Sequence, residues 1–252
     1  MRNLAFFLGL MAAASVQAQT ASITFQSSAA QTALLELYTS EGCSSCPPAE
    51  AWLSRLKESP GLWKDFVPMA FHVDYWDYLG WRDPWATRDF SDRQRAYAQR
   101  WRSENIYTPG FVLNGKEWRD WSGRKEAPKS SGARAGVLTV SSSDTNRWQV
   151  SFATTLADGA KYEVQAALLA FGLNSDVKAG ENRGRRLNHD FAVVSVAKAP
   201  LIRSGGIVEG SLVFPVRRNT GNLALAVWIT QAGRLEPLQA TGGWLARSAP
   251  DR

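Results

Sequence analysis

The sequence predicts an α/β domain followed by an antiparallel β-sandwich-like domain. In the first half, strand-type apolar runs alternate with segments whose apolar residues recur at helical spacing. Such alternation implies a mainly parallel sheet. From residue 137 onward, short β-type runs alternate with turn residues, a pattern typical of an antiparallel sandwich or barrel. With 44% hydrophobic and 21% charged residues, the composition is that of a globular protein.

The expected organisation has four parts. The N-terminus combines the positive charge of Arg2, an apolar stretch and a small-residue exit at Ala18, which together indicate a signal peptide. The apolar stretch is too short for a comfortable transmembrane helix. We therefore expect an exported protein, periplasmic or secreted, with no stable membrane insertion after cleavage. The predicted parts are a signal peptide at 1–18, the α/β domain at 30–121, a linker at 122–136 and the β-rich domain at 137–247.

Each expected element has its own signal. Ala33–Thr39 is a nearly continuous apolar run of the kind that a buried parallel strand needs. Residues 49–57 carry apolar side chains at helical spacing and predict a helix. The remaining elements of the first half are a strand at 66–73, an aromatic loop at 74–85, a polar helix near 90–102 and a strand at 110–113. The second half predicts strands at 137–141, 148–155, 162–171, 191–197, 212–216 and 223–230.

The two cysteines of the chain, Cys43 and Cys46, lie at the junction between the first strand and the first helix. The N-terminal end of a helix stabilises a thiolate, and a C-x-x-C beside a strand–helix pattern is the signature of a thioredoxin-like redox site. We expect Cys43 to attack and Cys46 to resolve the mixed disulfide. A structural clip is the alternative, but so short a ring removes little chain entropy.

Three further residues are catalytic candidates. A thioredoxin-like fold predicts a cis-proline opening the strand that faces the cysteines, and Pro109 leads directly into such a strand. An ordinary trans turn proline is the alternative. Glu36 is a carboxylate inside an apolar run, where it can exchange protons with Cys46 or reach solvent or an arginine at a strand edge. His72 can assist proton transfer or bind a metal together with nearby aspartates, but we favour a hydrogen-bonded histidine in an aromatic loop.

Substrate contacts are expected around these residues. Thr108 can present backbone groups to an extended substrate, and Tyr75, Trp76 and Trp81 can form an aromatic surface that faces it. The same aromatic residues can instead pack between the two domains. A single C-x-x-C and two distant histidines match no zinc-site spacing, so we expect no metal and no cofactor.

Four segments resemble an exported bacterial thioredoxin-like family that is catalogued as a domain of unknown function. They are GCSSCPPAE at 42–50, HVDYWDYLGW at 72–81, YTP at 107–109 and GENRGRRLNHD at 180–190. The resemblance spans most of the chain and implies a thioredoxin-like fold, but it implies no established activity. One departure is that residues 118–136 offer no clear amphipathic helix to close such a domain.

The function that these observations favour is thiol–disulfide oxidoreduction, with exported protein thiols and disulfides as substrates and an unidentified redox partner. The net charge of +6 is modest, and the arginines are interleaved with acidic residues. This favours a solvated basic face over nucleic-acid binding. Two alternatives stay open: a non-catalytic thioredoxin-like binding module, and soft-metal (copper) handling by the dithiol.

Overall fold

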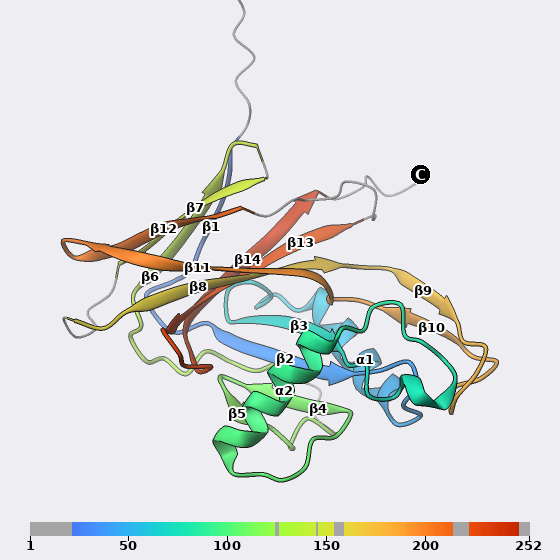
Figure 1. Ribbon diagram of the computed structural model, residues 1–252. Helices are drawn as coiled ribbons and strands as arrows, with labels where there is room; N and C mark the ends of the chain where they lie inside the picture. Colours follow the sequence, from blue (N-terminus) through green and yellow to red (C-terminus); the bar gives the residue numbers. More distant parts are fainter. Residues whose placement is uncertain (1–21, 124–125, 145, 154–158, 214–221, 247–252) are drawn as a thin grey trace, which may run out of the picture.

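The computed structural model describes residues 22–123, 126–144, 146–153, 159–213 and 222–246. Within these residues, twelve strands form one mixed sheet, along which the order β1-β6-β7-β12-β11-β3-β2-β4-β5 forms a continuous path (Figure 1). Strand β8 joins this path at β11, β13 pairs with β8, and β14 pairs with β13. The predicted fold class is therefore wrong: strands of both halves share one large sheet instead of forming an α/β thioredoxin-like domain and a following sandwich.

The strands of the sheet are β1 (Ile23–Gln26), β2 (Ala33–Thr39), β3 (Phe66–His72), β4 (Gly110–Leu113), β5 (Lys116–Glu117), β6 (Val137–Ser142), β7 (Arg147–Ala153), β8 (Tyr162–Ala170), β11 (Ala192–Ser204), β12 (Ile207–Val213), β13 (Leu223–Gln231) and β14 (Pro237–Ala246). Strands β9 (Leu173–Asp176) and β10 (Arg186–His189) form a separate pair. The described helices are α1 (Cys46–Arg55) and α2 (Arg88–Trp101), with 3-10 turns at η1 (Leu56–Glu58) and η2 (Asp77–Leu79). None of the helices in the described ranges has the length and hydropathy that a membrane span requires.

Strand β2 is the element that positions the candidate site. It runs parallel to β3 and antiparallel to β4, and every one of its residues is buried. Successive side chains of a strand point to opposite faces. Accordingly, Thr39 bonds to α1 through Glu50, whereas the ring of Tyr38 packs against Tyr97 of α2. The two helices thus cover opposite faces of β2.

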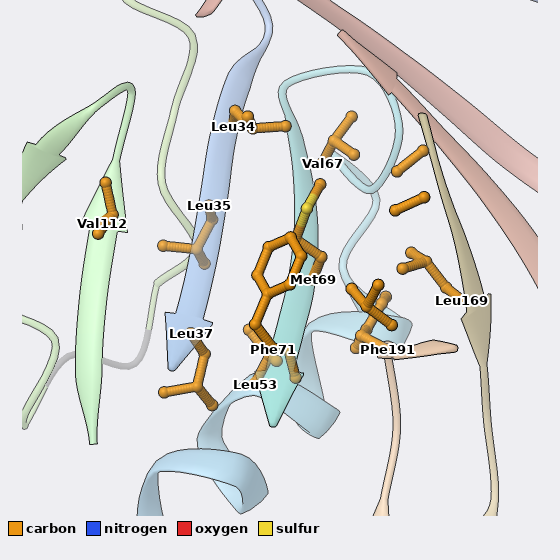
Figure 2. Packing of buried hydrophobic residues seen from close by; sticks show 14 of the residues in the cluster. Leu34, Leu35, Leu37, Leu53, Val67, Met69, Phe71, Val112, Leu169 and Phe191 are labelled. Atoms are coloured by element: carbon orange, nitrogen blue, oxygen red, sulfur yellow. The ribbon is translucent and has the colours of Figure 1, made fainter. Parts of the chain in front are cut away.

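The two cores of the molecule share a layer of strands. One core lies around β2 and β3 and includes Leu169 of β8, seen beside β3 in Figure 2. The other core lies against β6 and β7 and includes Leu168, the neighbouring residue of β8. Because alternate residues of one strand serve two cores, the β-rich half packs directly on the helix-bearing half.

Strand β11 makes the connection within the sheet. Ala192 pairs with Ala70 of β3, and the rest of β11 pairs with β8 and β12. The predicted signal peptide at 1–18 lies outside the described residues. The residue boundaries expected for the domains and the linker stay a prediction.

Candidate functional site at the Cys43–Cys46 turn

The candidate site is the turn between β2 and α1. Cys43 and Cys46 are joined by a disulfide, and their Cα atoms are 5.5 Å apart. Helix α1 begins at Cys46 with prolines in its first turn, where backbone N–H groups need no intrahelical partner. Cys43 is 1% exposed and Cys46 is fully buried. The disulfide is therefore closed off from solvent.

The aromatic loop covers one side of this turn. Gly42 packs so closely on Trp76 that a Cβ added at Gly42 would lie 2.8 Å from the Trp76 Cβ. The indole N–H of Trp76 donates a hydrogen bond to Thr108 Oγ1 at 2.8 Å. The Thr108–Pro109 peptide bond is cis, as expected from the sequence. Trp76 therefore connects the C-x-x-C turn with the segment that leads into β4.

A second segment, residues 180–185 between β9 and β10, covers the turn from the other half of the chain; we call it the clamp. The buried Asn182 amide donates to the backbone carbonyls of Glu41 and Cys43, both at 2.9 Å. The carboxylate of Glu181 accepts the Ser44 N–H at 2.9 Å, and hydrogen bonds from the side chain and the backbone of Ser44 lower the pKa of Glu181. The clamp thus bonds to the backbone immediately before and within the C-x-x-C.

Two histidines and three carboxylates form a buried group on the α1 side of the turn, which we call the His–carboxylate cluster: Glu41, Glu50, His72, Asp83 and His189. His189 Nδ1 bonds to Glu50, and His189 Nε2 lies 2.9 Å from Glu41 Oε1. His72 Nδ1 lies 2.7 Å from Asp83 Oδ2. The two imidazole rings meet edge to face, with centroids 4.9 Å apart.

The carboxylates hold the two histidines towards their charged forms. Burial disfavours a charged His189, but hydrogen bonds with Glu41 and Glu50 and their negative charge prevail and raise its pKa to about 10. For His72 burial likewise opposes charge, and the charge and hydrogen bond of Asp83 raise its pKa. Burial favours a neutral Glu50, yet the bond from His189 lowers the Glu50 pKa. The cluster can therefore hold protons in the interior of the protein.

The family follows from a comparison with known sequences. The model of the family described as "Protein of unknown function (DUF1223)" matches residues 34–230. The chain belongs to this family. The predicted relation to a family of unknown function is confirmed, and all four resembling segments lie within the match. A search of the curated proteins gave no match.

Two solved structures are similar to this DUF1223 chain. Protein AGR_C_4864 from Agrobacterium tumefaciens is 21% identical with a TM-score of 0.59, and the alignment covers 88% of this chain and 98% of that one. HBP35 of Porphyromonas gingivalis is 12% identical with a TM-score of 0.57, and the alignment covers 89% of this chain and 79% of that one. At these identities the similarity concerns the fold alone.

Glu36 of the DUF1223 chain lies away from the cysteines. It points to the α2 face of β2, where its carboxylate accepts two bonds from Arg93, at 2.8 and 2.9 Å, and one each from the hydroxyls of Tyr38 and Tyr97. Glu36 thus pairs with an arginine, as one interpretation expected, but it is buried on a strand inside the sheet and not at a strand edge. On the α1 face the buried carboxylate is Glu50, four residues after Cys46 on the same side of the helix.

The aromatic candidates are bonded within the protein. The Tyr75 hydroxyl donates to Gln94 Oε1 at 3.1 Å, and the Trp81 indole donates to Glu41 Oε2 at 2.6 Å. Trp81 thereby connects the aromatic loop to the His–carboxylate cluster. Substrate contact by Tyr75, Trp76, Trp81 and Thr108 stays a prediction, as do the catalytic roles of Cys43, Cys46, Pro109 and His72.

Sequence reasoning missed Asn182, Glu50 and His189 as site residues. Their partners lie far away in the chain: Asn182 bonds to Cys43 across 139 residues, as does His189 to Glu50. The available signal was the resembling segment at 180–190, which contains both Asn182 and His189. A polar segment that carries a family resemblance and is predicted as neither helix nor strand is a candidate part of a functional site, because binding and catalytic residues often lie on loops.

Proposed function

We propose that the Cys43–Cys46 pair exchanges disulfides with thiols of other proteins. The observation that carries the proposal is a disulfide at the N-terminus of α1 with a proton-holding cluster on the same side of that helix. Free N–H groups and the helix dipole favour a thiolate at this position. The signal-like pattern at residues 1–18 supports exported proteins as the partners.

The exchange starts with attack of a partner thiolate on Cys43 Sγ. The Cys43–Cys46 bond breaks, its electron pair leaves with Cys46 Sγ, and a mixed disulfide joins the partner to Cys43. A second partner thiolate then attacks the partner sulfur of the mixed disulfide and releases Cys43 as a thiolate. The partner is oxidised by two electrons and the cysteine pair is reduced by two. The reverse sequence reduces a partner disulfide.

The His–carboxylate cluster assists the leaving sulfur. Glu50 lies one helical turn after Cys46 on the same side of α1, and its bond to His189 supplies a proton store. A sulfur leaving as a buried thiolate is costly without a proton or a positive charge nearby. Glu50 and His189 provide both.

Access to the disulfide requires movement of the cover. A thiolate must reach a sulfur along the disulfide bond, and both cysteines are buried. The clamp is bonded to the turn through Asn182 and Glu181, whereas Trp76 is additionally packed against the core. We therefore assign the opening movement to the clamp.

Trapping of partners tests the proposal. Cys46→Ala should accumulate mixed disulfides through Cys43 in its native compartment, because Cys46 resolves the mixed disulfide in the reverse sequence, in which Cys43 attacks a partner disulfide; Cys43→Ala should not. Reduction of insulin by wild type, with Cys43→Ser as its control, measures the same chemistry in solution. If neither variant captures a partner and the pair has a reduction potential below about −300 mV, as structural disulfides do, a non-catalytic binding module becomes the better explanation.

A further inference from the structure

The His–carboxylate cluster contains a buried nitrogen that lacks a partner. His72 is fully buried, and its Nε2 has no hydrogen-bond partner among the described residues. An unsatisfied buried polar atom costs about 1–3 kcal/mol. Glu50, His72 and His189 each offer one potential ligand atom, and these three atoms lie within 4.8 Å of one another. The free nitrogen therefore belongs to a side chain that is already grouped with a second histidine and a carboxylate.

The other nitrogen of each histidine is held as it is in metal-binding histidines. A ligating histidine usually donates its outer N–H to a carboxylate, which fixes the ring and its tautomer. His72 meets Asp83 in this way through Nδ1, and His189 meets Glu41 through Nε2. Asp83 in turn accepts the backbone N–H groups of Glu41 and Trp85, both at 2.9 Å. The outer partners are thus fixed themselves.

We propose that His72 Nε2, His189 Nδ1 and a carboxylate oxygen of Glu50 bind a divalent first-row transition-metal ion such as Zn²⁺. Two imidazoles and one carboxylate form a ligand set that zinc and non-haem iron use in sites with an open position. Ligand bonds of about 2.0–2.2 Å require the three side chains to move closer together. The ion takes the place of the direct hydrogen bond between His189 and Glu50.

The charge of the cluster fits a dication. Glu41, Glu50 and Asp83 bring three carboxylates into the interior, and buried charges require compensation. A divalent ion bound to two neutral imidazoles supplies two positive charges that compensate these carboxylates.

A cleft between α1 and β10 gives the ion a route to Glu50. Its volume is about 350 Å³, and Glu50 and Asp190 line it together with the basic residues Arg185 and Arg186. Glu50 itself is 7% exposed. A binding site in a protein needs an entry path, and of the three proposed ligands Glu50 is the one that lines this cleft.

Calorimetric titration of the chelator-treated full-length protein with Zn²⁺, its disulfide intact, tests the site. We expect one ion per chain and a melting temperature that rises with Zn²⁺ concentration. His72→Gln and Glu50→Gln should each weaken binding at least tenfold, and Asp83→Asn, which leaves the three proposed ligands in place but alters the partner that orients His72, should weaken it about 10–100-fold. Cobalt absorption should indicate nitrogen and oxygen ligands without thiolate charge transfer.

Two controls separate this site from its neighbours. Glu181→Gln removes a carboxylate that bonds to the same turn outside the cluster, and it should leave Zn²⁺ affinity unchanged. Cys43→Ser/Cys46→Ser should also bind as wild type does. The proposal is overturned if the wild type binds no ion, if His72→Gln binds as tightly as wild type, or if the double cysteine variant loses the ion, which would assign the metal to the dithiol.

Discussion

Asn182→Ala should open the disulfide to reductants. The substitution removes two hydrogen bonds, both 2.9 Å long, to the buried carbonyls of Glu41 and Cys43. The Cys43 carbonyl keeps the Cys46 N–H as a donor, so its lost bond costs about 1 kcal/mol, whereas the Glu41 carbonyl keeps no other donor among the described residues, which costs about 1–3 kcal/mol. Opening of the clamp breaks these two bonds in the wild type as well. The substitution therefore destabilises the closed form and leaves the free energy of the open form unchanged. At about 2 kcal/mol, the low end, the open population rises about 30-fold.

The rate of disulfide reduction measures this population. Excess dithiothreitol reduces the protein, alkylation traps the thiols, and mass spectrometry gives the rate. We expect at least a tenfold faster reduction in Asn182→Ala. Asn174→Ala is the matched control, because the side-chain amide of Asn174, an exposed residue of β9, donates to the carbonyl of Gly172, just before this strand and in no bond with the C-x-x-C turn. Equal reduction rates in wild type and Asn182→Ala would refute the role of the clamp as the cover. The same conclusion would follow if Asn174→Ala were accelerated equally, or if the faster reduction of Asn182→Ala matched an increase in global unfolding measured in urea.

The other predictions concern the two faces of β2 and the turn. Glu36→Ala leaves a buried guanidinium unpaired and should lower the free energy of unfolding by about 3–5 kcal/mol, measured in urea; an altered reduction potential with unchanged stability would contradict its position on the α2 face. Gly42→Ala places a Cβ 2.8 Å from the Trp76 Cβ and should displace Trp76 from the C-x-x-C turn. We expect faster reduction of the disulfide and a change in tryptophan fluorescence; a reduction rate equal to that of the wild type would argue against the contact. Cys43→Ser/Cys46→Ser should lose about 2 kcal/mol or less, because the ring is short; insoluble protein would instead favour a structural clip.

Local signals were sufficient for the elements that surround the turn. The apolar run Ala33–Thr39 is β2 as predicted, and the strand predicted at 110–113 is β4. The polar helix expected near 90–102 is α2, which begins at Arg88 because Thr87 caps it by accepting the N–H of Phe90. In each case, the residues that determine the element lie within the element or next to it.

The fold class was wrong because it depends on pairings that no local pattern specifies. The parallel junction between the two halves is the single pair Ala192–Ala70, at the start of β11. No strand was predicted at β14, which contains Gly242 and Gly243, residues that weaken a strand pattern. Both glycines instead allow close packing: a Cβ at Gly242 would lie 2.6 Å from the Leu225 carbonyl, and one at Gly243 would lie 2.3 Å from the Phe25 ring.

The residues of the candidate site show the same contrast between local sequence signals and contacts that only the fold creates. The Cys43–Cys46 disulfide could be predicted because the two cysteines lie three positions apart at a strand–helix junction. Glu36 was a catalytic candidate because it is a carboxylate within the apolar run of β2. Strand alternation places its side chain on the face away from α1, where Arg93 pairs with it. Helical spacing from Cys46 points to Glu50 instead, and this signal was present in the sequence. His189 could not be found in this way, since only the fold brings it to Glu50.

Burial of the cysteines and of the His–carboxylate cluster must be explained together. A disulfide across so short a ring adds little stability, and buried ionic groups can often be replaced by apolar residues without loss of stability. A contribution to stability therefore does not by itself account for either feature, and both lie near the start of α1 beneath cover contributed by distant parts of the chain. A structural explanation predicts that loss of either feature is costly and that the clamp is irrelevant to the sulfurs. A chemical explanation predicts small losses of stability, large changes in reactivity and dependence on Asn182.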